Sequence, residues 1–141
     1  MKVERIIVAV DGSPNSVVAV EWAGVLAQAT DADVVALHAF GLLEQFDATN
    51  PDLPGPDRLE VEQRLGSVWC APLARAGVRF EPLVLDGNPV LTVLAATEDL
   101  HADVIVLGRR GLGGHPGLLL GSTSAQVARQ SRVPVVIVPH E

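Results

Sequence analysis

The chain has 141 residues and a mass of 14.8 kDa, which fits one domain and leaves little room for a second. Hydrophobic residues make up 48% of it and charged residues 19%, which excludes wholesale disorder. A net charge of -7 and an aromatic content of 4% argue against a nucleic-acid surface, and the charge also opposes binding to an anionic membrane.

Five strand-like runs alternate with helical stretches along the chain. They cover residues 3–10, 33–40, 78–85, 103–107 and 133–138. The first, fourth and fifth runs are continuously apolar and rich in Val and Ile, which is typical of parallel strands buried on both faces. The pattern therefore predicts an α/β domain with a parallel sheet.

Helix-start signals follow the first and third of these runs. Ser13-Pro14 and Asn88-Pro89 each combine a capping residue with a proline suited to the first helical position. Residues 122–131 predict a short last helix. After Ser13-Pro14, apolar residues recur at helical spacing, and we expect the tryptophan among them to anchor the core; they are Val18, Trp22, Val25, Leu26 and Ala29.

The helix between the second and third strands carries an apolar face and a proline. Gly77 is a good helix stop, and Pro72 is expected to kink or shorten the helix. The face consists of Leu65, Val68, Trp69, Leu73 and Ala76. Residues 41–57, which contain three prolines, predict a long surface loop. We expect Trp69 to anchor the core, and His38 and Cys70 to be structural core residues.

Alternating strands and helices predict an open, Rossmann-like sheet with right-handed crossovers and helices on both faces, within a single domain over residues 1–141. Pro82 removes a ladder donor, which places the third strand at an edge. The simplest layout is strand order 3-2-1-4-5. Ligands bind such sheets beyond the carboxyl ends of the strands where the order reverses, here near Asp11 and the segment after Leu107.

The segment after the fourth strand combines glycines, arginines and hydroxyl residues. Glycines allow close backbone approach to a ligand, and the N–H groups of the following helix start attract anions. From Gly108 onward the chain has four arginines and one acid, whereas residues 1–107 have six basic and sixteen acidic residues. No G-x-x-x-x-G-K-[ST] motif is present, so this is not a P-loop. The segment predicts a phosphate cradle of another kind.

These residues resemble a known family. Gly108-x2-Gly111-x9-Gly121-Ser122 matches the ATP-binding motif of the universal stress protein family, G-x2-G-x9-G-[ST], in every fixed position. Residues 7–13, 36–40, 103–108 and 133–138 also look like its strands and first loop. The resemblance implies an ATP-binding, five-stranded fold of the adenine nucleotide alpha hydrolase-like type. It also implies a homodimer formed through the last strand, from Val133 to Val138.

The resemblance further implies a set of nucleotide-binding residues. Asp11 would lie near the ribose, and Ala39 would offer backbone contacts to adenine. Arg110 stands where a side chain can reach toward the phosphates. The whole set is Ala9, Val10, Asp11, Ala39, Leu107, Gly108, Arg110, Gly111, Gly121, Ser122, Thr123 and Ser124.

Several interpretations remain open from the residues. Asp11 is equally well read as the N-cap of the first helix. Ser122, Thr123 and Ser124 also suit a cap of the last helix, but the glycine spacing favours phosphate contact. The main functional hypothesis is a stress-response regulator that binds ATP, with Mg²⁺ indirectly oriented by Asp11. The alternatives are a slow ATP hydrolase, and an interaction module that binds cyclic AMP or no nucleotide.

The chain also carries expectations about its location. The first residues lack a signal-peptide pattern, and no apolar run reaches the roughly 18–20 residues of a membrane helix. We therefore expect a cytoplasmic protein with no membrane or nucleic-acid partner.

Overall fold

A computed structural model describes residues 1–41, 55–109 and 122–139. Its core is a parallel five-stranded sheet in the order β3-β2-β1-β4-β5, as the sequence predicts. β1 lies at the centre and pairs with both β2 and β4, so the strand order reverses between β1 and β4. The strands are β1 (Arg5–Ala9), β2 (Asp33–Phe40), β3 (Phe80–Asp86), β4 (Val104–Gly108) and β5 (Val135–Val138).

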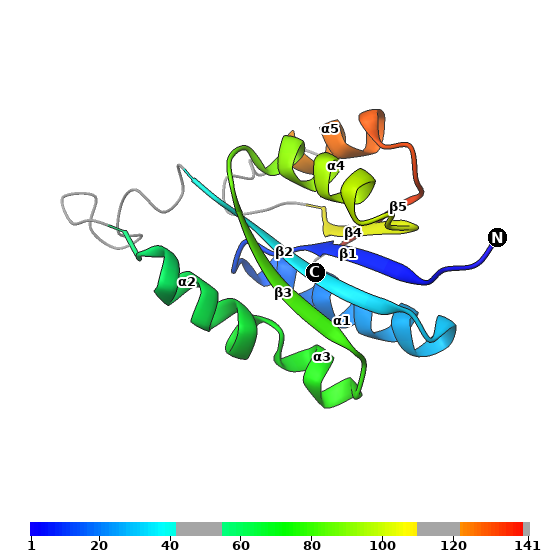
Figure 1. The fold of residues 1–141 in the computed structure, drawn as a ribbon, viewed down its shortest axis with the longest axis horizontal. Helices are drawn as coiled ribbons and strands as arrows, with labels where there is room; N and C mark the ends of the chain where they lie inside the picture. Colours follow the sequence, from blue (N-terminus) through cyan, green and yellow to red (C-terminus); the bar gives the residue numbers. More distant parts are fainter. Residues whose placement is uncertain (42–54, 110–121, 140–141) are drawn as a thin grey trace.

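Helices cover both faces of the sheet. One face carries α1 (Pro14–Thr30), α2 (Arg58–Arg64) and α3 (Ala71–Ala76), and the other carries α4 (Pro89–Asp99) and α5 (Ser122–Gln130) (Figure 1). Successive strand residues point to opposite faces. Ile6 and Val8 therefore join the apolar cluster under α1, while Ile7 joins the cluster under α4.

The predicted helix starts are confirmed. Ser13 caps α1 by accepting a hydrogen bond from the Ser16 amide, and Asn88 caps α4 by accepting from the amides of Val90 and Leu91. A proline follows each cap at the first helical position, where the missing N–H has no partner to lose.

The predicted core face of α1 is confirmed at Val18 and Leu26, which pack partly buried against the core, and is wrong at Trp22, Val25 and Ala29. Trp22 is 53% exposed and Val25 is 55% exposed, so neither anchors the core. The buried face consists of the smaller residues Ser16, Ala19, Val20, Ala23, Gly24 and Ala27. The physical reason is close packing: a Cβ on Gly24 would stand 3.5 Å from Leu73 and 3.7 Å from Ala76 of α3, which leaves no room for a large side chain.

The second helical region is interrupted next to Pro72, as predicted, but its buried face differs from the prediction at Val68. It begins at Arg58, with Asp57 as its cap, and passes through a π-helical turn, η2 (Leu65–Trp69), before it breaks at Cys70. Pro72 then lies in the first turn of α3, where proline is tolerated, so the break precedes it. Val68 is 69% exposed and does not share the buried face.

Other structural predictions are confirmed. β3 is an edge strand and contains Pro82, His38 and Cys70 are buried, and Gly77 ends α3 in a left-handed conformation. Trp69 packs only partly buried against the core. The greater part of the predicted 41–57 loop lies outside the described residues. Within the ranges described, no helix has both the length and the apolar character of a membrane span.

Candidate functional site

The carboxyl ends of β1 and β4 meet the first turn of α1. β1 and β4 pair directly, from Ile6–Val104 to Val8–Val106. At the end of β4, a Cβ on Gly108 would lie 2.8 Å from the backbone oxygen of Asn15, in the first turn of α1. Only glycine permits this approach. The predicted switch point is therefore a tight junction between β4 and the start of α1.

Asp11 shapes the turn between β1 and α1. Its Oδ1 accepts a hydrogen bond of 2.8 Å from the Ser13 amide, two residues further on. Gly12 between them has φ +82°, a left-handed conformation that side chains rarely adopt. The helix cap is Ser13, so the interpretation of Asp11 as the N-cap is wrong. Asp11 instead holds the turn closed at the carboxyl end of β1.

Two aromatic side chains support this turn from the α2 and α3 face. His38 donates a hydrogen bond of 2.6 Å from Nδ1 to the backbone oxygen of Val10. The rings of His38 and Trp69 lie 5.4 Å apart, tilted by 48°. A Cβ on Gly12 would stand 2.7 Å from the Trp69 ring. Sequence reasoning placed both aromatics in the core and missed their contact with the Asp11 turn.

Small side chains lie at the carboxyl ends of β1 and β2. Ala9 is half-buried and packs against the cluster under α4. Val10 continues the pairing of β1 with β2, because its amide donates a hydrogen bond of 2.8 Å to the Leu37 oxygen. Ala39 is also half-buried and follows Leu37 by two residues, so it faces the same side of the sheet. The buried Leu107 lies on this side as well. Ala9 and Ala39 thus present little bulk beside the switch point.

The first turn of α5 is tied to the end of β4. The buried Ser124 hydroxyl donates a hydrogen bond of 2.8 Å to the Arg109 carbonyl, whose own amide donates to Val138 at 2.9 Å. A hydroxyl has one proton to donate, so the Ser124 side chain positions α5 against β4. Ser122 is exposed and Thr123 is half-buried. The N-terminus of α5 therefore lies at the same edge of the sheet as the Asp11 turn.

Part of the predicted site lies outside the described residues. Arg110, Gly111 and Gly121 belong to this part of the chain. Their neighbour Arg109 is described, and its Nε is buried without a hydrogen-bond partner.

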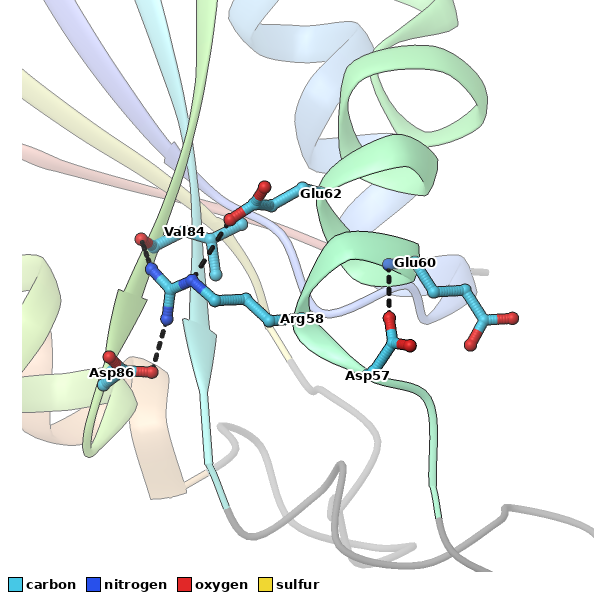
Figure 2. A network of polar contacts seen from close by, with 6 residues as sticks. All are labelled: Asp57, Arg58, Glu60, Glu62, Val84 and Asp86. Atoms are coloured by element: carbon cyan, nitrogen blue, oxygen red, sulfur yellow. Dashed lines mark hydrogen bonds and ion pairs between the residues drawn. The ribbon is translucent and has the colours of Figure 1, made fainter.

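An arginine not singled out by sequence reasoning joins α2 to the carboxyl ends of β2 and β3. The Arg58 guanidinium donates to the Val84 carbonyl at 2.7 Å, to Asp86 at 2.5 Å and to Glu62 at 3.1 Å (Figure 2). It also lies 6.0 Å from the ring centre of Phe40. The sequence could have indicated the start of α2 through Asp57, which is a typical N-cap residue. It could not have indicated the partners of Arg58 on β3.

A cavity of about 560 Å³ lies at the other end of the sheet. It is lined by the last turn of α4, by Asp103 before β4 and by residues 130–133 before β5. These are the amino ends of the strands, so this cavity is separate from the switch point. In the part of the chain that the structure covers, no three His, Cys, Asp or Glu side chains gather as a metal site.

Comparison with known proteins identifies the family. The model of the universal stress protein family matches residues 2–139. A universal stress protein of Thermus aquaticus is 34% identical, over 96% of this chain and 98% of its own length. One from Mycobacterium tuberculosis is 31% identical over 94% of this chain, which spans only 44% of that relative.

A solved structure agrees with both the sequence match and the fold. It is a universal stress protein crystallised in complex with cAMP, 28% identical to this chain, and the two superpose with a TM-score of 0.76 over 99% of this chain and 98% of the other. Together with the match over residues 2–139, this establishes that the chain belongs to the universal stress protein family.

Proposed function

We propose that this protein is a stress-response regulator that binds an adenine nucleotide, with ATP as its ligand, at the carboxyl ends of β1 and β4. The observation that carries the proposal is the junction of Gly108 with Asn15, which brings the Asp11 turn beside the end of β4. Ser124 adds the N-terminus of α5 at the same edge. Main-chain N–H groups at helix starts are suited to phosphates.

In this proposal each part of the nucleotide has its own residues. The ribose lies near Asp11, and the base lies over the small side chains and backbone of Ala9, Val10 and Ala39, beside Leu107 and Gly108. The phosphates lie at the start of α5 and along the glycine motif, namely Arg110, Gly111, Gly121, Ser122, Thr123 and the backbone of Ser124. The similar protein crystallised with cAMP supports adenine as the base.

Mg²⁺ enters the proposal only together with ATP. Protein-bound Mg²⁺ is held mainly by phosphates, water and one or two carboxylates. Asp11 is suited to the carboxylate role because it lies at the end of β1, and the phosphates would supply the remaining charge. Nucleotide occupancy would then alter the surface of a homodimer formed through β5.

The experiment compares nucleotide affinity between two aspartate variants. Isothermal titration with ATP and with cAMP is performed on the wild type, on Asp11→Ala and on Asp99→Ala. Asp99 is exposed at the far end of α4 and serves as the matched control. We expect Asp11→Ala to weaken ATP binding tenfold or more, about 1.4 kcal/mol, and Asp99→Ala to change it less than twofold.

Three outcomes would contradict the proposal or part of it. A wild-type protein that binds neither nucleotide removes the proposed function. Equal ATP affinity in the wild type and Asp11→Ala removes Asp11 from the site. Tighter binding of cAMP than of ATP replaces the proposed ligand. Asp11→Asn, which keeps the acceptor for the Ser13 amide, separates loss of charge from loss of the turn.

A further inference from the structure

Arg109 has a buried side-chain nitrogen that no group in the described part of the chain satisfies. Its Nε is buried without a hydrogen-bond partner, and within the described ranges its guanidinium forms no ion pair. Arg75 and Arg129 also lack a partner among these residues, but both are exposed, so water solvates their charge. A buried donor of a charged group that is left unpaired is costly, and native proteins contain few of them. This cost calls for an explanation in terms of function.

The backbone of Arg109 is held on two sides. Its amide donates a hydrogen bond of 2.9 Å to the Val138 carbonyl, and its carbonyl accepts one of 2.8 Å from the Ser124 hydroxyl. Val138 is the last residue of β5, and Ser124 is the third residue of α5. Arg109 is therefore fixed between the end of the sheet and the start of α5, where main-chain N–H groups and the helix dipole favour an anion.

The alternation of β4 determines the face from which the Arg109 side chain leaves the sheet. The amides of Ile105 and Arg109 both donate toward the β5 side, to the carbonyls of Pro134 and Val138. The alternation of the strand thus continues as far as Arg109, and residues 105, 107 and 109 share one face. Ile105 and Leu107 belong to the cluster under α4. Arg109 therefore lies on the face that carries the small side chains proposed for the base.

We propose that Arg109 binds the phosphates of the nucleotide beyond the first one, and so selects a nucleoside di- or triphosphate over a monophosphate. The inference rests on the proposed function, which places the ribose at the end of β1 and the phosphates at the start of α5. A guanidinium presents Nε and a terminal nitrogen as a planar fork that matches two phosphate oxygens. A phosphate would supply the partner that Nε lacks within the described residues.

The position of Arg109 in the sheet favours the later phosphates over the first. Ala39, proposed for the base, lies on β2, and Arg109 follows β4. β2 and β4 are two strand spacings apart, about 10 Å, with β1 between them. A cyclic monophosphate closes its one phosphate back onto the ribose, whereas a polyphosphate extends away from the ribose. Arg109 is thus placed for the extended ligand.

The distribution of charge favours the same ligand. The whole chain has a net charge of -7, which repels a polyanion, so a site for one needs positive charge close by. Residues 104–109 and 122–139 contain three arginines and no acidic residue. Arg129 lies in the last turn of α5, and Arg132 pairs with Glu98. Of these three arginines, Arg109 is the one at the carboxyl end of the sheet.

The experiment measures nucleotide selectivity in matched variants. Isothermal titration with ATP, ADP, AMP and cAMP is performed on the wild type, Arg109→Met, Arg109→Lys and Arg129→Met. Methionine keeps an unbranched stem without the charge, and the exposed Arg129 is the control for the same loss of charge. We expect Arg109→Met to weaken ATP binding tenfold or more and AMP and cAMP binding less than twofold. Arg109→Lys should lose less ATP affinity, and Arg129→Met should stay within twofold for every nucleotide.

Unfolding separates a binding role of Arg109 from a structural one. Without nucleotide, Arg109→Met should have a urea midpoint equal to or above that of the wild type, because it loses a buried donor that had no partner. A fixed ATP concentration should raise the wild-type midpoint more than that of Arg109→Met. A nucleotide-free midpoint below that of the wild type would overturn the proposal, since Arg109 would then serve the fold itself.

The titrations distinguish failure of this inference from failure of the proposed function. A wild-type protein that binds none of the four nucleotides overturns both. Wild-type binding of ATP that is unchanged in Arg109→Met overturns the role of Arg109 alone. An equal loss of affinity for ATP and cAMP also overturns it, because Arg109 would then not discriminate by the number of phosphates.

Discussion

The turn after β1 provides the most direct test of the site's construction. Replacing Gly12 by alanine adds one methyl group at a residue with φ +82°, whose Cβ would stand 2.7 Å from the Trp69 ring. The left-handed backbone costs about 1–2 kcal/mol for a non-glycine residue. The steric overlap costs a further 1–3 kcal/mol or so. We expect Gly12→Ala to lower the free energy of unfolding by about 2–5 kcal/mol.

Gly77 is the matched control for the backbone contribution. It has φ +70°, and a Cβ there would meet nothing within 4 Å. Gly77→Ala should therefore lower the free energy of unfolding by the backbone cost alone, about 1–2 kcal/mol. The difference in the free energy of unfolding between Gly12→Ala and Gly77→Ala isolates the cost of the contact with Trp69. The double variant Gly12→Ala, Trp69→Leu removes the obstructing ring and should recover that difference.

The assay is urea denaturation of the wild type and the variants, combined as a double-mutant cycle over Gly12 and Trp69. We expect Gly12→Ala to cost about 1–3 kcal/mol less in the Trp69→Leu background than in the wild type. The reasoning is refuted if Gly12→Ala and Gly77→Ala destabilise equally, or if the cycle shows no coupling. Titration with ATP then shows whether the displaced turn also weakens nucleotide binding.

Three further predictions concern single side chains. Arg58→Ala should lower the free energy of unfolding by about 1–2 kcal/mol, because it removes the hydrogen bond to the Val84 carbonyl. Arg64→Ala should lower it by no more than about 0.5 kcal/mol, because the ion pair of Arg64 with Glu60 is exposed. Urea denaturation compares the two variants. Burial raises the pKa of the Cys70 thiol from 9.0 to about 11. The contribution of the protonated thiol to the free energy of unfolding is therefore complete below pH 9 and is lost as pH rises toward 11. The free energy of unfolding should fall across this interval, and less so in Cys70→Ala. Ser124→Ala should cost about 1 kcal/mol in thermal unfolding by removing the bond to the Arg109 carbonyl, and an equal cost for Ser122→Ala would contradict that role.

The strand order could be predicted because a few residues act locally and strongly. Pro82 cannot donate to a ladder on its N–H side, so it placed β3 at an edge without knowledge of its neighbours. Ser13 and Asn88 signal helix starts through their own side chains and the prolines that follow. Such effects depend on a few neighbouring residues, which a sequence displays directly.

The misassigned face of α1 shows where this reasoning stops. Hydrophobic spacing favoured Trp22 and Val25, but α1 packs so closely on the sheet and on α3 that only small residues fit beneath it. The distance between two packed elements depends on the side chains of both surfaces. The hydrophobic pattern along one helix shows the side chains of that helix alone. Arg58 is a similar case, since its partners on β3 lie 26 and 28 residues further along the chain.

Gly108 connects the family motif to the construction of the site. The motif was interpreted through the phosphates that its glycines would contact, yet at Gly108 the structure shows a steric demand of the protein itself. A Cβ would meet the backbone oxygen and carbon of Asn15 at 2.8 and 3.0 Å. The two explanations are compatible, because the same close approach brings the end of β4 beside the Asp11 turn. A substitution at Gly108 would consequently disturb folding and binding together, and for that reason Asp11 is the better residue with which to test the site.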